Sequence, residues 1–269
     1  MFQSYYGMSC NPFIKNNEAK EPYKSNDFIE LTNRFNFLKE VKGIGVFCGC
    51  SGTGKTYTIR NFINNLNNEL YKIIYISATK GISLFDFFKE VGKFLNIDTG
   101  ACYKTDMYHN IQKEIRYLVD VQKKHPIIII DDAHNLSKEI LLNLKILFEY
   151  DINSKDYISL YLIGENELIT KIQNDMFTYL RQRIIVNYTT QGLSRTEVKE
   201  YVKTRLEIAN INYNLFTENA FNALYSCSKT FPRNINTLVL NCLMIGSQLD
   251  EKIIDEKIVM DAKGEMDLI

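Results

Sequence analysis

The chain has 269 residues, 45% hydrophobic and 24% charged, so it can bury a full core in one large or two smaller domains. Basic and acidic residues number 32 each, which excludes a global positive field for nucleic acid. Six cysteines without a CxxC pair and three histidines without ligand spacing argue against zinc. No apolar run reaches the roughly 20 residues that span a bilayer, and no signal-peptide layout is present, so we expect a cytoplasmic protein without a membrane segment.

Short apolar runs alternate with segments of helical periodicity up to about residue 191, which is typical of an α/β sheet. Three of the runs are nearly continuous aliphatic stretches, as in parallel strands covered on both faces. Strands are expected at 44–48, 72–76, 127–130, 158–163 and 184–188. Helices are expected between them, for example at 55–68, 83–95, 106–122 and 137–150.

The strand pattern stops after Gly192, and only helical patterns follow. A Ser194-x-x-Glu197 capping box opens a helix that runs towards Ala209. Three further helices are expected at 217–227, 232–247 and 255–262. The sequence therefore predicts an α/β domain over residues 1–191 and a small helical lid over residues 192–269.

A glycine-rich segment directly follows the first expected strand and opens a helix. It reads Gly49-Cys50-Ser51-Gly52-Thr53-Gly54-Lys55-Thr56 and continues with Tyr57. The pattern is G-x-x-x-x-G-K-[ST], whose backbone N–H groups wrap nucleotide phosphates. Lys55 is predicted to pair with the β- and γ-phosphates and Thr56 to hold Mg²⁺. A plain glycine turn is the alternative, but the strand, loop and helix context favours an ATP and Mg²⁺ site at residues 49–57.

Two carboxylates follow the third expected strand, an unbroken run of four isoleucines at 127–130. A buried strand that ends beside a phosphate site must supply a partner for magnesium. Asp131 suits that metal, and Asp132 suits activation of the attacking water. Taken alone, the pair could equally well end the strand and cap the helix that begins near Ser137. Together with the Lys55 loop, the catalytic interpretation is preferred.

Further segments extend the pattern in a fixed order along the chain. They are Ile-Ile-Asp-Asp-Ala-His-Asn-Leu at 129–136, Leu-Ile-Gly at 162–164, Leu-Arg-Gln-Arg-Ile at 180–184, Pro-Arg-Asn-Ile-Asn at 232–236, and an Asn-Pro-Phe element at 11–13. Together with the glycine-rich loop they resemble an AAA+ ATPase. More narrowly they resemble the ExeA/TniB group, which includes ExeA-type secretion ATPases and transposition ATPases similar to TniB and the Mu phage B protein. The resemblance implies a P-loop AAA+ fold with a parallel five-stranded sheet, and ATP hydrolysis.

The resemblance also implies roles for single residues. Asp131 matches the Walker B metal residue, and Asp132 stands where the family more often has a catalytic Glu, one methylene longer. Of the turn after the fourth strand, Asn166 is the favoured sensor 1, because the charge of Glu165 would repel the γ-phosphate. The remaining matches are Arg181 or Arg183 to the arginine finger, Arg233 to sensor 2, and Asn11, Pro12 and Phe13 to an element near adenine.

Each arginine also has a simpler interpretation. Arg181 and Arg183 could be solvated charges at a helix end, and Arg233 a solvent-exposed residue at a helix start. Without the resemblance, we would prefer these structural interpretations for all three.

The favoured function is an ATP-dependent DNA-binding adaptor of transposition. Such a protein would form a homo-oligomeric ring or filament on double-stranded DNA, without sequence preference, and recruit a transposase. Its DNA contacts are expected at Thr79 and Lys80, with Lys104 as a further contributor. The alternative is a secretion-associated or other cytosolic regulatory ATPase that acts through protein contacts without DNA. A third option is a nucleotide-binding module that has lost hydrolysis, which Asp132 in place of Glu keeps open.

Overall fold

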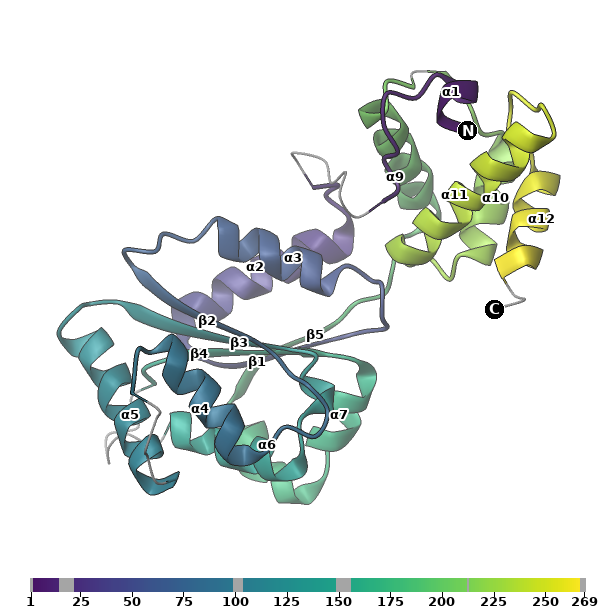
Figure 1. Ribbon diagram of the computed structural model, residues 1–269. Coiled ribbons are helices and arrows are strands. Elements are labelled where there is room, and N and C mark those ends of the chain that lie inside the picture. Colours follow the sequence, from purple (N-terminus) through teal and green to yellow (C-terminus); the bar gives the residue numbers. More distant parts are fainter. Residues whose placement is uncertain (1, 15–21, 99–103, 149–155, 212, 267–269) are drawn as a thin grey trace. The chain divides into compact units, whose positions relative to one another are not determined.

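The computed structural model describes residues 2–14, 22–98, 104–148, 156–211 and 213–266. Contacts divide the chain into two compact units, each of which is described by itself (Figure 1). The α/β unit comprises Glu30–Ser51 and Lys55–Thr190. The helical unit comprises Met1–Ile29, Gly52–Gly54 and Gln191–Ile269.

The α/β unit is built on a five-stranded parallel sheet, as the sequence predicted. Its strand order is β2-β3-β4-β1-β5, so β2 and β5 are the edge strands and β4 lies at the centre. Every strand pair is parallel. The strands are β1 (Gly43–Cys48), β2 (Tyr71–Ser77), β3 (His125–Asp131), β4 (Ser159–Gly164) and β5 (Ile184–Thr189).

Helices cover both faces of this sheet (Figure 1). On one face lie α2 (Asn26–Val41) and α3 (Lys55–Asn64), and on the other α4 (Leu84–Phe94), α5 (Lys104–Asp120), α6 (Lys138–Asn143) and α7 (Asn166–Ile172). The short α8 (Thr178–Gln182) leads into β5. The isoleucines of β3 show why both faces must be covered. Ile127 and Ile129 belong to the core under α2 and α3, whereas Ile128 and Ile130 belong to the core on the opposite face.

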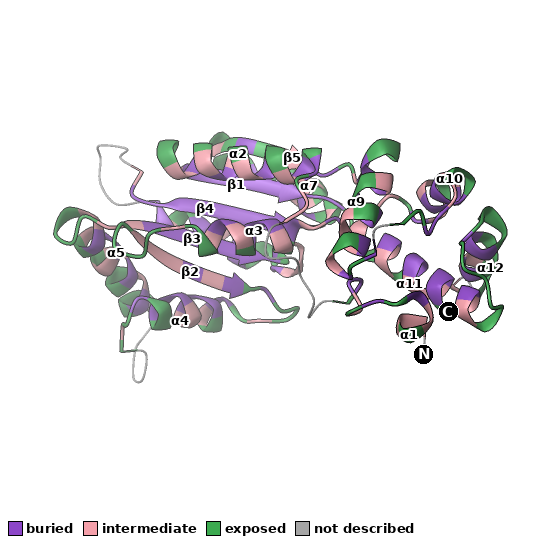
Figure 2. Ribbon diagram, turned by 90° about the horizontal axis from the view of Figure 1, so that it is seen from above, coloured by how far each residue is buried: buried purple, intermediate pink, exposed green. Residues whose placement is uncertain are grey.

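The helical unit consists of α1 (Phe2–Tyr6), α9 (Arg195–Ile208), α10 (Glu218–Cys227), α11 (Pro232–Gln248) and α12 (Glu256–Met266). The expected capping box is present, because the Ser194 hydroxyl accepts from the Glu197 backbone N–H and the Glu197 carboxylate accepts from the Ser194 N–H. In Figure 2, the buried sides of these helices face one another. No described helix is both long and apolar enough to cross a membrane.

The observed division differs from the expected domains at the N-terminus. The boundary after β5 falls between Thr190 and Gln191, next to the expected position, but residues 1–29 group with the helical unit. The reason is apolar packing, because Tyr6, Met8 and Phe13 are buried members of the helical unit's core. Local sequence patterns do not reveal that the N-terminal segment packs against helices at the C-terminal end of the chain.

Two expected helices are shorter in the structure. The helix expected at 55–68 ends at Asn64, and the one expected at 137–150 becomes α6 followed by a 3-10 turn at Leu144–Leu147. The end of the second expectation, residues 149 and 150, lies outside the described residues. The helices α1, α2, α7 and α8 were not among those named in advance.

Candidate active site

Three neighbouring strands bring their carboxyl ends to one edge of the sheet. β1 ends at Cys48 before the glycine-rich loop, β3 ends at Asp131, and β4 ends at Gly164. Because β3, β4 and β1 are adjacent and parallel, segments more than 100 residues apart in the sequence meet there. Ligands of open parallel sheets bind at this edge.

Lys55 is folded back onto the glycine-rich loop from the first position of α3. Its Nζ donates to the carbonyl oxygens of Gly49 and Cys50, both at 2.8 Å, and the residue is only 8% exposed. Burial lowers the pKa of Lys55, while the negative charges of Glu165 and Asp131 oppose that shift. A buried ammonium bonded to loop carbonyls is a cation that phosphate oxygens could engage in their place.

The loop also requires glycine at its start. The backbone of Gly49 has φ +151°, and a Cβ there would lie 1.8 Å from the Thr190 hydroxyl oxygen. Gly52 and Gly54 have φ +87° and +96°, in the region that side chains disfavour. The pattern that identified this loop in the sequence therefore reflects real backbone demands.

Asp131 is buried, at 4% exposure, and its carboxylate accepts three hydrogen bonds. Its Oδ2 accepts from the Thr56 hydroxyl at 2.9 Å and from the Tyr75 hydroxyl at 2.8 Å. Its Oδ1 accepts from the Asp132 backbone N–H at 3.0 Å. A hydroxyl and a carboxylate held together are hard oxygen donors of the kind that Mg²⁺ prefers, so the pair fits that metal.

Asp132 stands in a left-handed backbone conformation, with φ 53°. Burial and the neighbouring Asp131 raise the pKa of its carboxyl, while His134 and Lys55 oppose the shift. A carboxylate with a raised pKa is a stronger base, which is what activation of a water molecule requires.

His134 ties this segment to the end of β4. Its Nδ1 accepts from the Glu165 backbone N–H at 3.3 Å, which assigns the proton of the neutral ring to Nε2. Lys171 Nζ donates to the carbonyl oxygens of His134 and Leu136. Together these bonds fix the loop after Asp132 against both ends of α7, because Glu165 precedes its first residue and Lys171 lies in its last turn.

The two residues of the turn after β4 differ in their surroundings. Glu165 is half-buried and interacts electrostatically with both Lys55 and Asp132, whereas Asn166 is exposed at the start of α7. Sequence reasoning favoured Asn166 and set Glu165 aside. It also gave no role to His134, although this residue stands in the run at 129–136, or to Tyr75, which stands in no motif; a signal for Tyr75 is its place near the end of the second expected strand.

Arg181 and Arg183 lie at the opposite, amino edge of the sheet. Arg183 directly precedes β5, and its carbonyl accepts from Ile44 N at the start of β1. β1 has six residues, so the glycine-rich loop lies roughly 16–20 Å further along the strands. The structure therefore does not bring these arginines to the phosphate loop of their own chain.

Both arginines have partners where they stand. The Arg181 guanidinium donates to the carbonyl oxygens of Ile172, Gln173 and Asn174 at the end of α7. Arg183 donates to the Asp156 carboxylate at 2.9 Å and packs over the rings of Phe148 and Tyr179.

The other expected site residues are spread over both units. Arg233, the second residue of α11, and the buried Pro12 and Phe13 belong to the helical unit. Thr79 and Lys80 are exposed in the turn after β2, and Lys104 is the first residue of α5.

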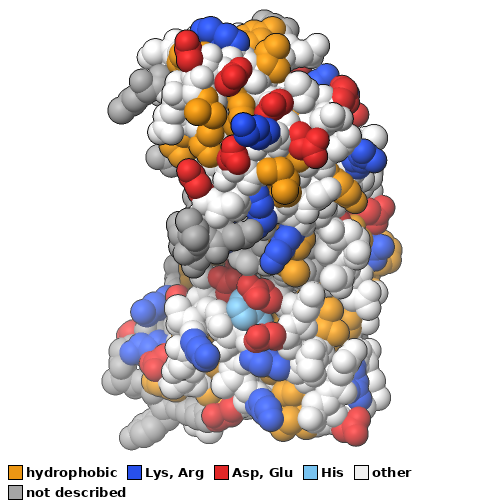
Figure 3. All heavy atoms as spheres, turned by 90° about the vertical axis from the view of Figure 1, so that its right-hand side faces the viewer, with side chains coloured by type: hydrophobic (Ala, Val, Ile, Leu, Met, Phe, Trp, Pro, Cys, Tyr) orange, Lys and Arg blue, Asp and Glu red, His pale blue; other side chains and the backbone are white. Residues whose placement is uncertain are grey.

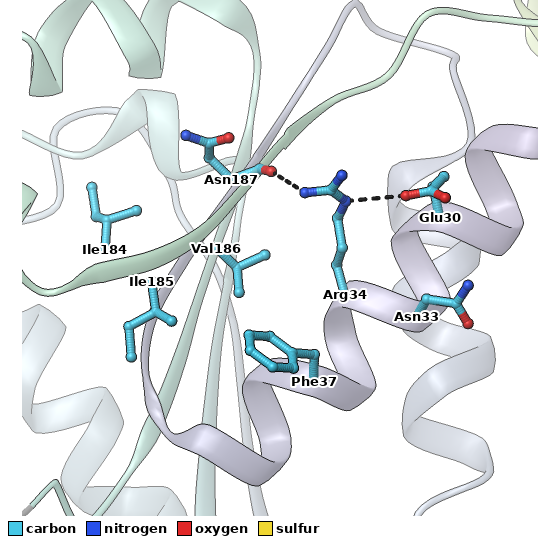
Figure 4. A pocket seen from close by; sticks show the side chains of 8 residues that line it. All are labelled: Glu30, Asn33, Arg34, Phe37, Ile184, Ile185, Val186 and Asn187. Carbon is cyan, nitrogen blue, oxygen red and sulfur yellow. Dashed lines mark hydrogen bonds and ion pairs between the residues drawn. The ribbon is translucent and has the colours of Figure 1, made fainter.

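A separate hollow lies between α2 and the edge strand β5 (Figure 4). Arg34 crosses it, donating to the Asn187 carbonyl at 2.8 Å and pairing with Glu30 at 3.3 Å. None of the expected site residues lines it, so it is not the phosphate site. Its lining residues are Glu30, Asn33, Arg34, Phe37, Ile184, Ile185, Val186 and Asn187.

Comparison with known proteins agrees with this geometry. The chain is 28% identical over 243 residues to General secretion pathway protein A of Aeromonas hydrophila, covering 88% of this chain and 43% of that protein. It thus spans less than half of that relative.

Solved structures share the fold at low identity. Cdc6p from Pyrobaculum aerophilum aligns with a TM-score of 0.67 at 15% identity, over 94% of this chain and 68% of that one. A chain of Drosophila ORC bound to DNA aligns with a TM-score of 0.68 at 16% identity, over 98% of this chain and 65% of that one. The family model described as AAA domain matches residues 38–172, half of the chain, which includes the glycine-rich loop and both carboxylates. The chain therefore belongs to the AAA domain family and is a P-loop ATPase.

Proposed function

We propose that the carboxyl edge of the sheet binds Mg-ATP and hydrolyses its terminal phosphate. The observation that carries this proposal is the 2.9 Å hydrogen bond between Thr56 and Asp131, residues 75 positions apart. Thr56 would hold Mg²⁺ through its hydroxyl oxygen, with its proton directed at Asp131. Magnesium, when bound, neutralises charge on the phosphates.

Lys55 binds the β- and γ-phosphates, exchanging its bonds to Gly49 and Cys50 for phosphate oxygens. The loop N–H groups from Gly49 to Tyr57 and the N-terminus of α3 add further donors. In this proposal, Pro12 and Phe13 lie near the adenine and Arg233 senses the γ-phosphate from the helical unit.

Asp132 orients the attacking water and accepts its proton. The raised pKa of Asp132, due to burial and to Asp131, supports that role. Asn166 is retained as the residue that senses the γ-phosphate. Glu165 attracts Lys55 electrostatically, which supports a competing role for Glu165. In that role, the phosphates of ATP would have to compete with Glu165 for the Lys55 ammonium.

Hydrolysis is completed between subunits of a homo-oligomer. Arg181 or Arg183 would supply the charge that stabilises the transition state, and their position at the amino edge is compatible only with a partner's ATP. Their bonds within the chain would have to be exchanged on assembly.

The cellular role that we favour is that of a regulatory ATPase acting through protein contacts. The alignment with General secretion pathway protein A over 88% of this chain supports a secretion-associated role. The balanced charge supports it too, and Figure 3 shows acidic and basic side chains intermixed on the face that it draws.

The DNA-binding adaptor of transposition stays the second candidate. The exposed Thr79 and Lys80 favour it, because a basic turn repeated around an oligomer would offer several phosphate contacts. Lys104 would add to them, and a transposase would be the partner.

Fluorescence anisotropy of labelled duplexes separates the two roles. The DNA role predicts binding with an ATP analogue but not with ADP, similar for unrelated sequences, with a steep salt dependence that weakens in Lys80→Ala. Lys72→Ala, which removes a lysine of β2 before the turn, is the matched control. Equal binding in all nucleotide states, or no binding at low salt and micromolar protein, would leave the protein-contact role.

A further inference from the structure

Tyr75 contacts the metal-binding carboxylate from a strand that contributes no other group to the proposed site. It lies on β2 and pairs in register with Ile129 of β3, two residues before Asp131. Because side chains alternate along a strand, Tyr75, Ile129 and Asp131 share one face of the sheet. The Tyr75 ring extends along that face to the carboxyl edge, where its hydroxyl donates to Asp131 Oδ2 at 2.8 Å.

The ring is held by its surroundings. Tyr75 is half-buried against the core formed with α2 and α3, which also contains Ile127, Ile129 and Tyr161. A hydroxyl on a packed aromatic ring has few alternative positions, so its hydrogen bond defines where the carboxylate stands.

The bonds to Asp131 have different donors. Thr56 reaches Oδ2 from α3, the Asp132 N–H reaches Oδ1 from the following residue, and Tyr75 reaches Oδ2 from β2. If the Thr56 hydroxyl oxygen binds a metal, the position of that hydroxyl, and with it its bond to Asp131, depends on the metal. Tyr75 and the backbone N–H are then the two donors that fix the carboxylate independently of it.

We propose that Tyr75 is a positioning residue for magnesium, which orients the Asp131 carboxylate through its hydroxyl. The proposal rests on the proposed function, in which Asp131 holds the metal. Partners of metal ligands typically contribute 10–100-fold in metal affinity or activity. Tyr75→Phe should therefore raise the Mg²⁺ concentration for half-maximal effect about tenfold, while turnover at saturating Mg²⁺ stays within about twofold of wild type.

The first test measures the thermal unfolding temperature with ADP across Mg²⁺ concentrations, which requires no turnover. Wild type should show a rise with Mg²⁺, and Tyr75→Phe the same rise displaced to about tenfold higher Mg²⁺. Tyr71→Phe is the matched control, because it removes a hydroxyl four positions earlier on the same strand and face. Its Mg²⁺ dependence should match wild type.

The outcomes separate the two proposals. If Tyr75→Phe lowers the unfolding temperature equally at all Mg²⁺ concentrations, the hydroxyl is only structural and the inference is overturned. If wild type itself shows no effect of Mg²⁺, the proposed metal site fails instead. A double-mutant cycle with Asp131→Asn adds a second check, because Tyr75→Phe should then no longer displace any remaining Mg²⁺ dependence; an unchanged displacement would overturn the inference.

Discussion

The two edges of the sheet carry similar charged residues in different settings. At the carboxyl edge, Lys55 is bonded to carbonyls of a loop, Gly49 and Cys50. At the amino edge, Arg181 is bonded to carbonyls that end α7. The last carbonyls of a helix lack helical partners, and Arg181 supplies donors to them, whereas Lys55 holds carbonyls of the loop that would itself wrap the phosphates. Position along parallel strands, more than residue type, thus separates the charges that can reach the chain's own phosphate loop from those that cannot.

Burial shifts the pKa of a titratable group at each edge. Burial raises the pKa of Asp132 at the carboxyl edge and lowers that of His125 at the amino edge to about 4. His125 Nε2 lies 2.9 Å from the Ser159 hydroxyl, which in turn donates to the Leu38 carbonyl. The ring must therefore donate to Ser159 from Nε2, and burial favours its neutral form.

The largest expected effect is that of Asp132→Asn on turnover. Because an amide cannot accept a proton from water, turnover should fall by on the order of 10²- to 10⁴-fold while ATP affinity is kept. In wild type, turnover should be lost as the pH falls through the raised pKa of Asp132, because the protonated acid is not a base. Steady-state hydrolysis across pH measures both effects, and turnover equal to wild type in Asp132→Asn would place the base elsewhere.

Lys55→Ala should weaken ATP binding by on the order of 100-fold, because a charge-assisted pair to the phosphates is lost. Arg181→Ala is the matched control from the amino edge, and its ATP affinity should stay within a few-fold of wild type. Calorimetric titration measures both variants. If Lys55→Ala and Arg181→Ala lose ATP affinity equally, the carboxyl edge would not be the one that binds the chain's own ATP.

Complementation tests whether the amino edge acts on a partner subunit. Lys55→Ala should be inactive alone, and so should the variant of whichever arginine, Arg181 or Arg183, reaches the partner's ATP. In a random 1:1 mixture, about a quarter of interfaces join an intact loop to an intact arginine, so activity should recover to about that fraction. No recovery with either arginine variant, in assemblies shown to be mixed, would make both arginines structural.

His125 predicts a pH effect on stability rather than on chemistry. Its pKa in the fold is about 4, below the ordinary 6.5, so the unfolded chain binds the proton first as the pH falls. Stability should therefore decline between about pH 6.5 and 4, by on the order of 3 kcal/mol. His125→Gln should flatten this part of the profile in urea unfolding, because Gln can donate to Ser159 but does not titrate. A decline of the same size in both proteins would exclude His125 as its source.

The sequence predicted the sheet and the glycine-rich loop well because both are local patterns. Ile127-Ile128-Ile129-Ile130 is readable as a strand covered on both faces, and Gly49 is required by the approach of Thr190. The place of Tyr6, Met8 and Phe13 was not predictable, since it depends on packing against a core formed some 190 residues later. The contact of Tyr75 with Asp131 depends on strand order and register, which no motif encodes.

The arginines show a second limit. Arg181 and Arg183 stand in a segment that resembles an arginine-finger region, but the pattern does not contain their distance from the loop or their partners. The distance follows from the parallel pairing of β5 with β1, and the partners follow from the packing of the arginines against the end of α7 and Asp156.

The most direct test of the difference between the edges compares two aspartates. Asp131→Asn alters the proposed metal carboxylate at the carboxyl edge, and Asp156→Asn alters the partner of Arg183 at the amino edge. Single-turnover ATP hydrolysis would be measured for wild type and both variants, from EDTA to saturating Mg²⁺. We predict Mg²⁺-dependent hydrolysis in wild type, its loss in Asp131→Asn, and an unchanged Mg²⁺ requirement in Asp156→Asn. Hydrolysis that persists in EDTA, or an Asp131→Asn protein with the Mg²⁺ dependence of wild type, would contradict the assignment of the site.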